Sequence, residues 1–537
     1  MPAGYLVLIL HAHLPYVKHT EREYTLEEDW LYEAITETYI PLLLIMEGWE
    51  NDGVPYRLTM SITPTLAAML EDDLLCHRYR RYLANLEDLA AKEVARTGHH
   101  PHVHRLARMY LERFRTVAAV WDRYRGRILN GFRRLQDTGR LEIVASGATH
   151  GYLPLMTATP EMARAQVRIG AEAYRRAFAR NPRGFWLPEC GYFPGHDRWL
   201  AEEGIRYTFV DGHGLLHASR RPRYGVYAPL ISPAGVAFFG RDGESSKQVW
   251  SMDEGYPGDF DYREFYRDVG FDLPWETIAP NLPHGLRTNT GIKYHRITGK
   301  TEHKELYDPE RAKSKAYLHA ANFVFNRERQ SEYLRSIMDR PPVIVAPYDA
   351  ELFGHWWFEG PYFLDGVVRR LAETPVVDMI TAGEYLSAFP VNQHAEPSQS
   401  SWGLNGYSEV WLDGCNDWIY RHLASASDKL LDLVLRFRES EGLARRALNQ
   451  AARELLLAQS SDWAFIMKTG TTVAYAERRT KEHLASFLQL YDMLVNGTVD
   501  AGWLAFREET AGIFPWLEAA EFFAPLPESE RQVISVG

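Results

Sequence analysis

Short apolar runs recur along the first two thirds of the chain, and polar or ionisable residues follow nearly every run directly. Runs of this length, bounded by turn residues, are typical of strands buried on both faces, and helical stretches separate several of them. The alternation of strand, polar tip and helix predicts a parallel sheet. The runs, about seven in number, begin at Tyr5, Tyr56, Leu141, Phe185, Ile205, Val343 and Val376.

Two other regions have a helical pattern. From residue 71 to 139, charged residues alternate with Leu, Tyr, Phe and Trp at helical spacing, which predicts a helical insertion after the second strand. Residues 418–523 are amphipathic almost throughout, and residues 393–401 are the best linker candidate before them. We therefore predict an α/β barrel over residues 1–70 and 140–392, an insertion domain over 71–139, and a C-terminal all-helical domain over 402–525.

Two long segments within the barrel region lack a clear period. Residues 224–250 are rich in Gly, Pro and Ser and predict a long hairpin or a lid over the site, because loops of this length are usually functional. Residues 260–299 predict further loops that line the site. In parallel barrels the site lies where the strands end, so we expect these polar residues to converge there: His11, His13, His150, Glu189, Asp211 and Asp349.

Charge and cysteine content exclude several classes of protein. The 60 basic and 71 acidic residues give a net charge of −11, which argues against nucleic acid or an anionic membrane as partner. No apolar run approaches the length of a membrane span. The three cysteines are far apart and odd in number, so we expect no disulfide framework. These features favour a cytoplasmic protein, and we expect a monomer.

The residues after two of the strands indicate the chemistry. Residues 343–360 carry three carboxylates, His355 and two adjacent tryptophans within a short stretch, and residues 185–195 carry Glu189 among aromatics and glycine. Ionised groups beside large aromatics suit a site that binds a hydroxylated ring and moves protons around it. Cleavage of a glycosidic bond canonically needs two carboxyl groups, one ionised and one protonated. We predict that Glu189 and Asp349 are this pair.

Five segments resemble the ordered motifs of glycoside hydrolase family 57. They are HAHLP at 11–15, GATHGYLP at 147–154, WLPECGY at 186–192, PYDAELFGHWWFEG at 347–360 and AQSSDWAF at 458–465. Their order and spacing agree over almost the whole chain. Within the family, residues 244–251 and 402–412 are most similar to members that branch α-1,4-glucans. The resemblance implies a (β/α)7 barrel with a helical insertion and a C-terminal helical domain, a retaining mechanism without cofactor or metal, and an α-1,4-glucan substrate such as amylose, glycogen or starch.

The resemblance also implies roles for individual residues. Glu189 corresponds to the nucleophile and Asp349 to the general acid/base. The substrate-binding positions that it implies are His11, His13, His150, Arg267, Trp275, Gly285, Trp402, Trp411 and Asp462, to which we add His355 from the motif around Asp349. Branching members carry a mobile loop with a tyrosine near its tip. The corresponding residues 232–246 offer Phe238 and Phe239 instead, and the nearest tyrosine is Tyr227.

Three other interpretations stay open. An α-amylase or a 4-α-glucanotransferase would share the fold and both carboxylates and would differ in what attacks the intermediate. A metal-dependent polysaccharide deacetylase would use His11, His13 and Asp211 as ligands, but it leaves Glu189, Asp349 and the tryptophans unexplained. A glucan-binding protein without activity would keep the aromatics and would not need the paired carboxylates.

Overall fold

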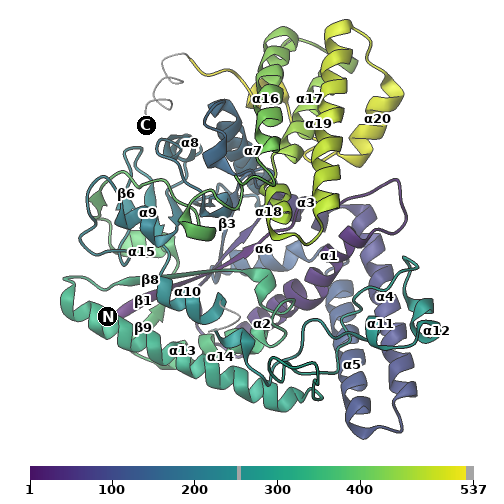
Figure 1. The fold of residues 1–537 in the computed structure, drawn as a ribbon. Helices are drawn as coiled ribbons and strands as arrows, with labels where there is room; N and C mark the ends of the chain where they lie inside the picture. The colour runs from purple at the N-terminus through teal and green to yellow at the C-terminus, as the bar shows by residue number, and fades with distance from the viewer. Residues whose placement is uncertain (251–254, 528–537) are drawn as a thin grey trace.

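The computed structural model describes residues 1–250 and 255–527 (Figure 1). Its centre is a barrel in which neighbouring strands are parallel. The ring closes where the backbone N–H of Asp242, just after the sixth strand, donates to the carbonyl of Val345, 2.9 Å away, on the seventh. This confirms the (β/α)7 barrel. In order around the ring, the strands are β1 (Gly4–Ala12), β2 (Leu58–Ile62), β3 (Leu141–Ser146), β4 (Gly184–Trp186), β5 (Tyr207–Val210), β7 (Ala237–Gly240) and β8 (Val343–Asp349).

The segment predicted as a long hairpin or a lid is a hairpin in the barrel wall, so the hairpin is confirmed and the lid was wrong. Within residues 224–250, β6 (Leu230–Ile231) pairs antiparallel with β7, and β7 pairs parallel with β5. Phe238 and Phe239 lie on β7 and are fully buried, so neither closes over the site. Helix α10 (Gly243–Trp250) follows, and Ser251 lies outside the described residues.

The predicted strand near Val376 exists but is not a member of the ring. It forms β9 (Val377–Met379), which within the described structure pairs with the first residues of β1. A further short strand, β10 (Gln393–His394), extends the sheet beside β6. The barrel therefore has the expected number of strands, with β7 in the place that the sequence assigned to β9.

Helices surround the barrel, and their ends follow from local sequence. In α13 (Pro309–Ile337), Pro309 occupies the first turn and the Asp308 carboxylate accepts from the N–H groups of Glu310 and Arg311. In α15 (Ala382–Ala388), Thr381 and Glu384 form a capping box. Further helices around the barrel are α1 (Leu26–Ala34), α2 (Ile40–Asn51), α7 (Pro160–Phe178), α8 (Asp197–Glu202), α9 (Gly212–Leu216) and α14 (Gly360–Glu373). A single π-helical turn, Ile35–Tyr39, joins α1 to α2.

Four helices lie between β2 and β3: α3 (Pro64–Leu70), α4 (Asp73–Arg96), α5 (Pro101–Arg123) and α6 (Leu129–Asp137). The long helices α4 and α5 pack side by side (Figure 1). They support the loop after α10, because Asn85 on α4 bonds to Asn281 and the Tyr110 hydroxyl on α5 donates to the carbonyl of Lys293. Two short helices of that loop are α11 (Val269–Asp272) and α12 (Trp275–Ile278).

The C-terminal region is helical, as predicted. Its helices are α16 (Trp418–Phe437), α17 (Gly442–Ala458), α18 (Ser461–Thr469), α19 (Val473–Asn496), α20 (Ala501–Thr510) and α21 (Ala519–Phe522). Helices α18 and α19 end at Gly470 and Gly497, each in the left-handed conformation that glycine adopts without strain. The N-terminus of α18 meets the barrel, since the N–H of Ser461 donates to the carbonyl of His150. The exact domain limits at 71–139 and 402–525 stay predictions.

None of the helices in the described part of the chain is long and apolar enough to cross a membrane.

Candidate active site at the interface of barrel and helical domain

The carboxyl ends of β1 and β8 bring the first site residues together. His11 is opposite Asp349 in the parallel register of these two strands. His13, two residues beyond His11, lies on the same side of the extended chain, and the two imidazoles are stacked with centroids 5.8 Å apart. The predicted convergence of polar residues at strand ends therefore holds for these three residues.

Glu189 occupies a strained turn after β4. Its φ of 60° and the φ of 50° at Cys190 both lie in the left-handed region, which costs a non-glycine residue on the order of 1–3 kcal/mol. The turn aims the carboxylate at residues of the C-terminal region. Trp402 donates its indole N–H to Oε2 at 2.9 Å, and the Ser461 hydroxyl donates to Oε1 at 2.8 Å.

Three histidines pack against each other beside this carboxylate. The rings of His13 and His150 are stacked with centroids 3.8 Å apart, and Nε2 of His11 is 3.1 Å from Nε2 of His150. His150 Nδ1 is 3.0 Å from the Ser461 hydroxyl. His13 Nε2 bonds to both Asp462 carboxylate oxygens, at 3.0 and 3.2 Å.

Asp349 has a different environment. Within the described residues, no group forms a hydrogen bond to its carboxylate, whereas Glu351, two residues further on, is tightly held. Oε1 of Glu351 accepts from the N–H of His13 at 3.1 Å and from the Tyr39 hydroxyl at 2.5 Å. Tyr39 ends the π-helical turn, a feature often found at functional sites. Asp349 thus lies next to a fixed acidic group with its own oxygens free.

The electrostatics of the two carboxyl groups differ accordingly. Burial, with the charges of Glu351 and Glu189 added, raises the pKa of Asp349 well above its ordinary value. Burial also raises the pKa of Glu189, but the bonds from Trp402 and Ser461 oppose that rise. Two carboxyl groups in contrasting surroundings are what acid and nucleophile roles require.

The pKa values of the three histidines are also shifted in different directions. Burial lowers the pKa of His11 and of His150 well below the ordinary value, so both rings are neutral at pH 7. Burial acts in the same direction on His13, but the neighbouring Asp462 carboxylate outweighs it and raises the pKa of His13. Its partner Asp462 has a lowered pKa, because His13 and Ser460 stabilise the carboxylate against burial.

His13, His150 and Asp462 also have donor atoms within 4.8 Å of one another, close enough to suggest a metal ion. Each donor already has a partner, however. Asp462 binds His13, and the two ring nitrogens of His150 face His11 and Ser461. Hydrogen bonding accounts for the contacts within this cluster, and activity without a metal stays a prediction.

The ligand set expected for a deacetylase is not assembled either. Asp211 bonds to Nδ1 of His213 at 3.1 Å and to Arg241 at 3.4 Å, and His11 faces His150. Asp211 therefore serves to fix His213 and Arg241.

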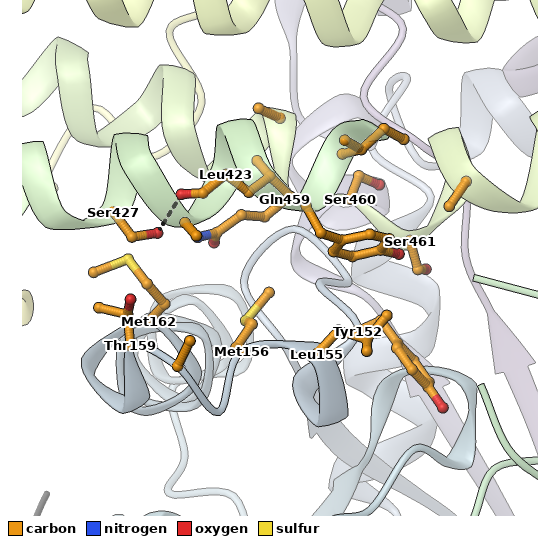
Figure 2. A pocket seen from close by; sticks show the side chains of 16 residues that line it. Tyr152, Leu155, Met156, Thr159, Met162, Leu423, Ser427, Gln459, Ser460 and Ser461 are labelled. Atoms are coloured by element: carbon orange, nitrogen blue, oxygen red, sulfur yellow. Dashed lines mark hydrogen bonds between the residues drawn. The ribbon is translucent and has the colours of Figure 1, made fainter. Parts of the chain in front are cut away.

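A small cavity of about 40 Å³ lies behind Ser461, between the barrel and the helical domain. Figure 2 shows residues of the β3–α7 loop and α7 on one side and residues of α16 and of the α17–α18 junction on the other. The labelled residues are Tyr152, Leu155, Met156, Thr159, Met162, Leu423, Ser427, Gln459, Ser460 and Ser461. The lining is mainly apolar, so this space adjoins the site without adding catalytic groups to it.

Comparison with known proteins identifies the family. The sequence model described as Glycosyl hydrolase family 57 matches residues 7–397, well over half of the chain. The chain belongs to glycosyl hydrolase family 57. A second model, described as the C-terminal part of 1,4-α-glucan branching enzymes, matches residues 422–522.

Individual family members cover nearly the whole chain. A 1,4-α-glucan branching enzyme of Thermococcus kodakarensis is 35% identical over 525 residues, which span 92% of this chain and 74% of that protein. The structure of the α-amylase AmyC from Thermotoga maritima is 47% identical, covers 98% of this chain and 100% of its own, and has a TM-score of 0.92. The branching enzyme from Pyrococcus horikoshii is 31% identical, with 98% of each chain covered and a TM-score of 0.88.

At four of the predicted substrate-binding positions, the local structure does not involve Glu189 or Asp349. Arg267 pairs with Asp272 at 2.9 Å, Trp275 lies under the guanidinium of Arg287, and Gly285 is in a turn with a φ of 65°. His355 bonds to Glu37 at 3.2 Å. A role of these four residues in binding glucan stays a prediction.

The two tryptophans predicted to bind substrate, Trp402 and Trp411, lie in different environments. Trp402 binds Glu189 directly, through its side chain and through its backbone N–H to the Glu189 carbonyl. Trp411 is only 1% exposed and stacks on Tyr152 with ring centroids 4.3 Å apart. The structure gives Trp411 a packing role, and its contact with a sugar stays a prediction.

The sequence analysis missed three groups that the structure places in the site. Ser461 lies inside the AQSSDWAF motif, next to the chosen Asp462, so the motif itself was the signal. Glu351 lies inside the motif of Asp349 and was counted only as one of three carboxylates. Tyr39 has no local signal, because it meets Glu351 across 312 positions of sequence.

Proposed function

We propose that this chain is a 1,4-α-glucan branching enzyme. It cleaves an α-1,4 bond of a glucan and re-forms it as an α-1,6 branch, with Glu189 as nucleophile and Asp349 as general acid/base. The observation that carries the proposal is the contrast between the two carboxyl groups. Glu189 accepts two hydrogen bonds, whereas Asp349 accepts none within the described residues and has a strongly raised pKa.

The two groups account for both halves of the reaction. Protonated Asp349 gives its proton to the glycosidic oxygen as the Glu189 carboxylate bonds to the anomeric carbon, and the reducing-end part of the glucan leaves. The resulting Asp349 carboxylate then removes the proton from the 6-hydroxyl of an acceptor chain. That oxygen displaces Glu189 from the anomeric carbon, which restores both carboxyl groups to their initial states.

The choice of acceptor decides whether a branch forms. Water is abundant, so transfer prevails only if a second glucan chain is held at the site. The match of residues 422–522 to the C-terminal part of branching enzymes supports branching, as do two relatives with that name. We further propose that the substrate is an amylose- or glycogen-like α-1,4-glucan used in glycogen synthesis.

Hydrolysis is the second candidate, and two observations favour it. One is the 47% identity to the α-amylase AmyC over essentially the full length of both chains. The other is the position of residues 230–250, which form β6, β7 and α10 instead of a loop that could cover the covalent intermediate. In that case water would attack the same intermediate on Glu189.

Proton NMR of amylose during incubation separates these outcomes. We expect the α-1,6 anomeric signal to rise while few new reducing ends form. Reducing ends without α-1,6 signal would make the chain an amylase, and redistributed α-1,4 chains without branches would make it a glucanotransferase. The Asp349→Asn variant is the blank, because it keeps the size of the side chain and cannot donate the proton.

The pH profile tests the role of the residue beside the acid. Glu351→Gln removes a negative charge that raises the pKa of Asp349, so that pKa should fall. Asp349 must be protonated to act as acid, so the alkaline limb of kcat/KM should move to lower pH, by about one unit. The acidic limb should move much less. The matched control, Glu384→Gln on α15, should leave both limbs in place. An unmoved alkaline limb in Glu351→Gln would contradict the assignment.

We also propose that the enzyme acts in the cytoplasm as a monomer. The cysteines support the cytoplasmic location, because the three of them are free in the described structure and disulfide bonds are typical of oxidising compartments.

A further inference from the structure

Four side chains form a continuous row of hydrogen bonds that ends on the proposed nucleophile. His11 Nε2 lies 3.1 Å from His150 Nε2, His150 Nδ1 lies 3.0 Å from the Ser461 oxygen, and that oxygen lies 2.8 Å from Glu189 Oε1. The row starts in the barrel, crosses to the N-terminus of α18 and returns to the barrel. Ser461 is the only member that belongs to the helical region.

The chemistry of the groups fixes the direction of each bond. The Glu189 carboxylate can only accept, so the Ser461 hydroxyl must donate to it. The serine oxygen then accepts from His150 Nδ1–H. A neutral His150 has one proton, so its Nε2 accepts in turn from His11 Nε2–H. This leaves His11 Nδ1 without a proton, and that atom is indeed buried without a partner among the described residues.

We infer that Ser461 is a positioning residue for the nucleophile, and that the His11–His150 pair directs its proton onto Glu189. This inference rests on the proposed role of Glu189. It gives the two histidines a different role from the contact with sugar that the sequence suggested. Their side chains leave little surface for a sugar, because His11 is 2% exposed and His150 is 1% exposed.

This row of hydrogen bonds helps to keep the buried Glu189 carboxylate ionised. Burial favours the neutral form of Glu189, yet the nucleophile must be ionised. The bonds from Ser461 and Trp402 favour the ionised form and fix both oxygens. A charged His150 would reverse its bond to His11, and its lowered pKa prevents this at neutral pH. Ionisable groups that act on Glu189 from the surrounding elements are His13, His150, Asp349 and Asp462.

The row also makes the site depend on the C-terminal region. Both donors to Glu189 come from residues after position 400, while the nucleophile itself is on the barrel. Backbone bonds hold the two regions in place here, since Ser461 donates to the carbonyl of His150 and Trp402 donates to the carbonyl of Glu189. The barrel thus supplies the nucleophile, and the helical region sets its position and charge.

Three variants of the full-length enzyme test this inference. Ser461→Ala removes the donor, and Ser461→Thr keeps the hydroxyl while the adjacent cavity of about 40 Å³ leaves room for a methyl group. Ser427→Ala is the matched control, because Ser427 is a buried serine of α16 that lines the same side of the cavity and bonds to its own helix (Figure 2). The readout is total α-1,4 bond cleavage, which counts transfer and hydrolysis together.

Ser461→Ala should lower kcat about 10- to 100-fold with KM within about twofold, because hydrogen bonds to charged groups contribute strongly. Without that donor the pKa of Glu189 rises, so the acidic limb of kcat/KM should move up by about one pH unit. Ser461→Thr should restore kcat to within about threefold and return the limb, and Ser427→Ala should match the native enzyme.

Two results would overturn the inference. One is a native kcat and acidic limb in Ser461→Ala. The other is a loss of activity that Ser461→Thr does not recover and that leaves the limb unmoved, since this would show a purely structural role. Glu189→Ala, assayed in parallel, keeps the two proposals apart. If it is inactive while Ser461→Ala is native, only the Ser461 inference fails, and if it is active, the proposed role of Glu189 fails.

Discussion

Replacing Glu189 with alanine should lower cleavage of amylose by at least about 10⁴-fold. The variant cannot form a covalent bond to the anomeric carbon, and the remaining groups give water no activated route. The loss should appear in kcat, since the other residues predicted to bind the glucan are unchanged. The measurement is the initial rate of bond cleavage in purified enzyme whose circular dichroism matches the native protein.

Glu172→Ala is the control for this experiment. Glu172 lies on α7, pairs with Arg175 and Arg176, and is remote in its contacts from Glu189. It should retain native activity. A Glu189→Ala enzyme with more than about a tenth of native kcat would remove Glu189 from the mechanism, because no second nucleophile should replace it so well.

Replacing Asp349 with alanine should affect substrates unequally. With amylose, kcat/KM should fall about 10³-fold, because no group protonates the departing sugar oxygen. With a maltooligosyl fluoride the fall should be about tenfold or less, because fluoride leaves without a proton. The measurement is the ratio of kcat/KM for the two substrates, in the variant and in the native enzyme.

Asp378→Ala, at an exposed position of β9, is the control and should leave that ratio unchanged. An equal loss on both substrates in Asp349→Ala would contradict acid catalysis by this residue. It would point instead to a role of Asp349 in holding the glucan, since weaker binding affects both substrates alike.

The sequence predicted those elements whose signal is local. β1 and β8 are long apolar runs with polar ends, and their register brings His11 and Asp349 together as expected. β7 was missed because its apolar run, Ala237–Gly240, is only four residues long and is surrounded by Gly, Pro and Ser. It becomes a strand because β5 on one side supplies backbone partners along its whole length. That contribution cannot be seen in a local pattern.

In the candidate site, too, residues with a local sequence signal could be predicted and their long-range partners could not. Glu189 and Asp349 could be named because each follows a strand within a distinctive motif. The partners that set their charge come from elsewhere: Ser461 is 272 positions from Glu189, and Tyr39 is 312 positions from Glu351. Long-range contacts of this kind follow from how the helical region and the π-helical turn pack against the barrel, which residue spacing does not encode.

The loop between α10 and α13, predicted to line the site, was the hardest segment to interpret from the sequence. Its positions were chosen by resemblance in a stretch without helical or strand period, and in the structure Arg267 and Trp275 have local partners. The insertion helices α4 and α5 support this loop through side-chain bonds, so its course depends on residues almost 200 positions away.

The central claim is that Glu189 attacks the anomeric carbon, and chemical rescue tests it most directly. Azide enters the space left in Glu189→Ala and attacks from the side that the carboxylate occupied. With an α-maltooligosyl fluoride as donor, the account predicts an azide-dependent rate and a maltooligosyl azide of β configuration, identified by the coupling constant of its anomeric proton. A product of α configuration, or no rate above that without azide, would contradict it.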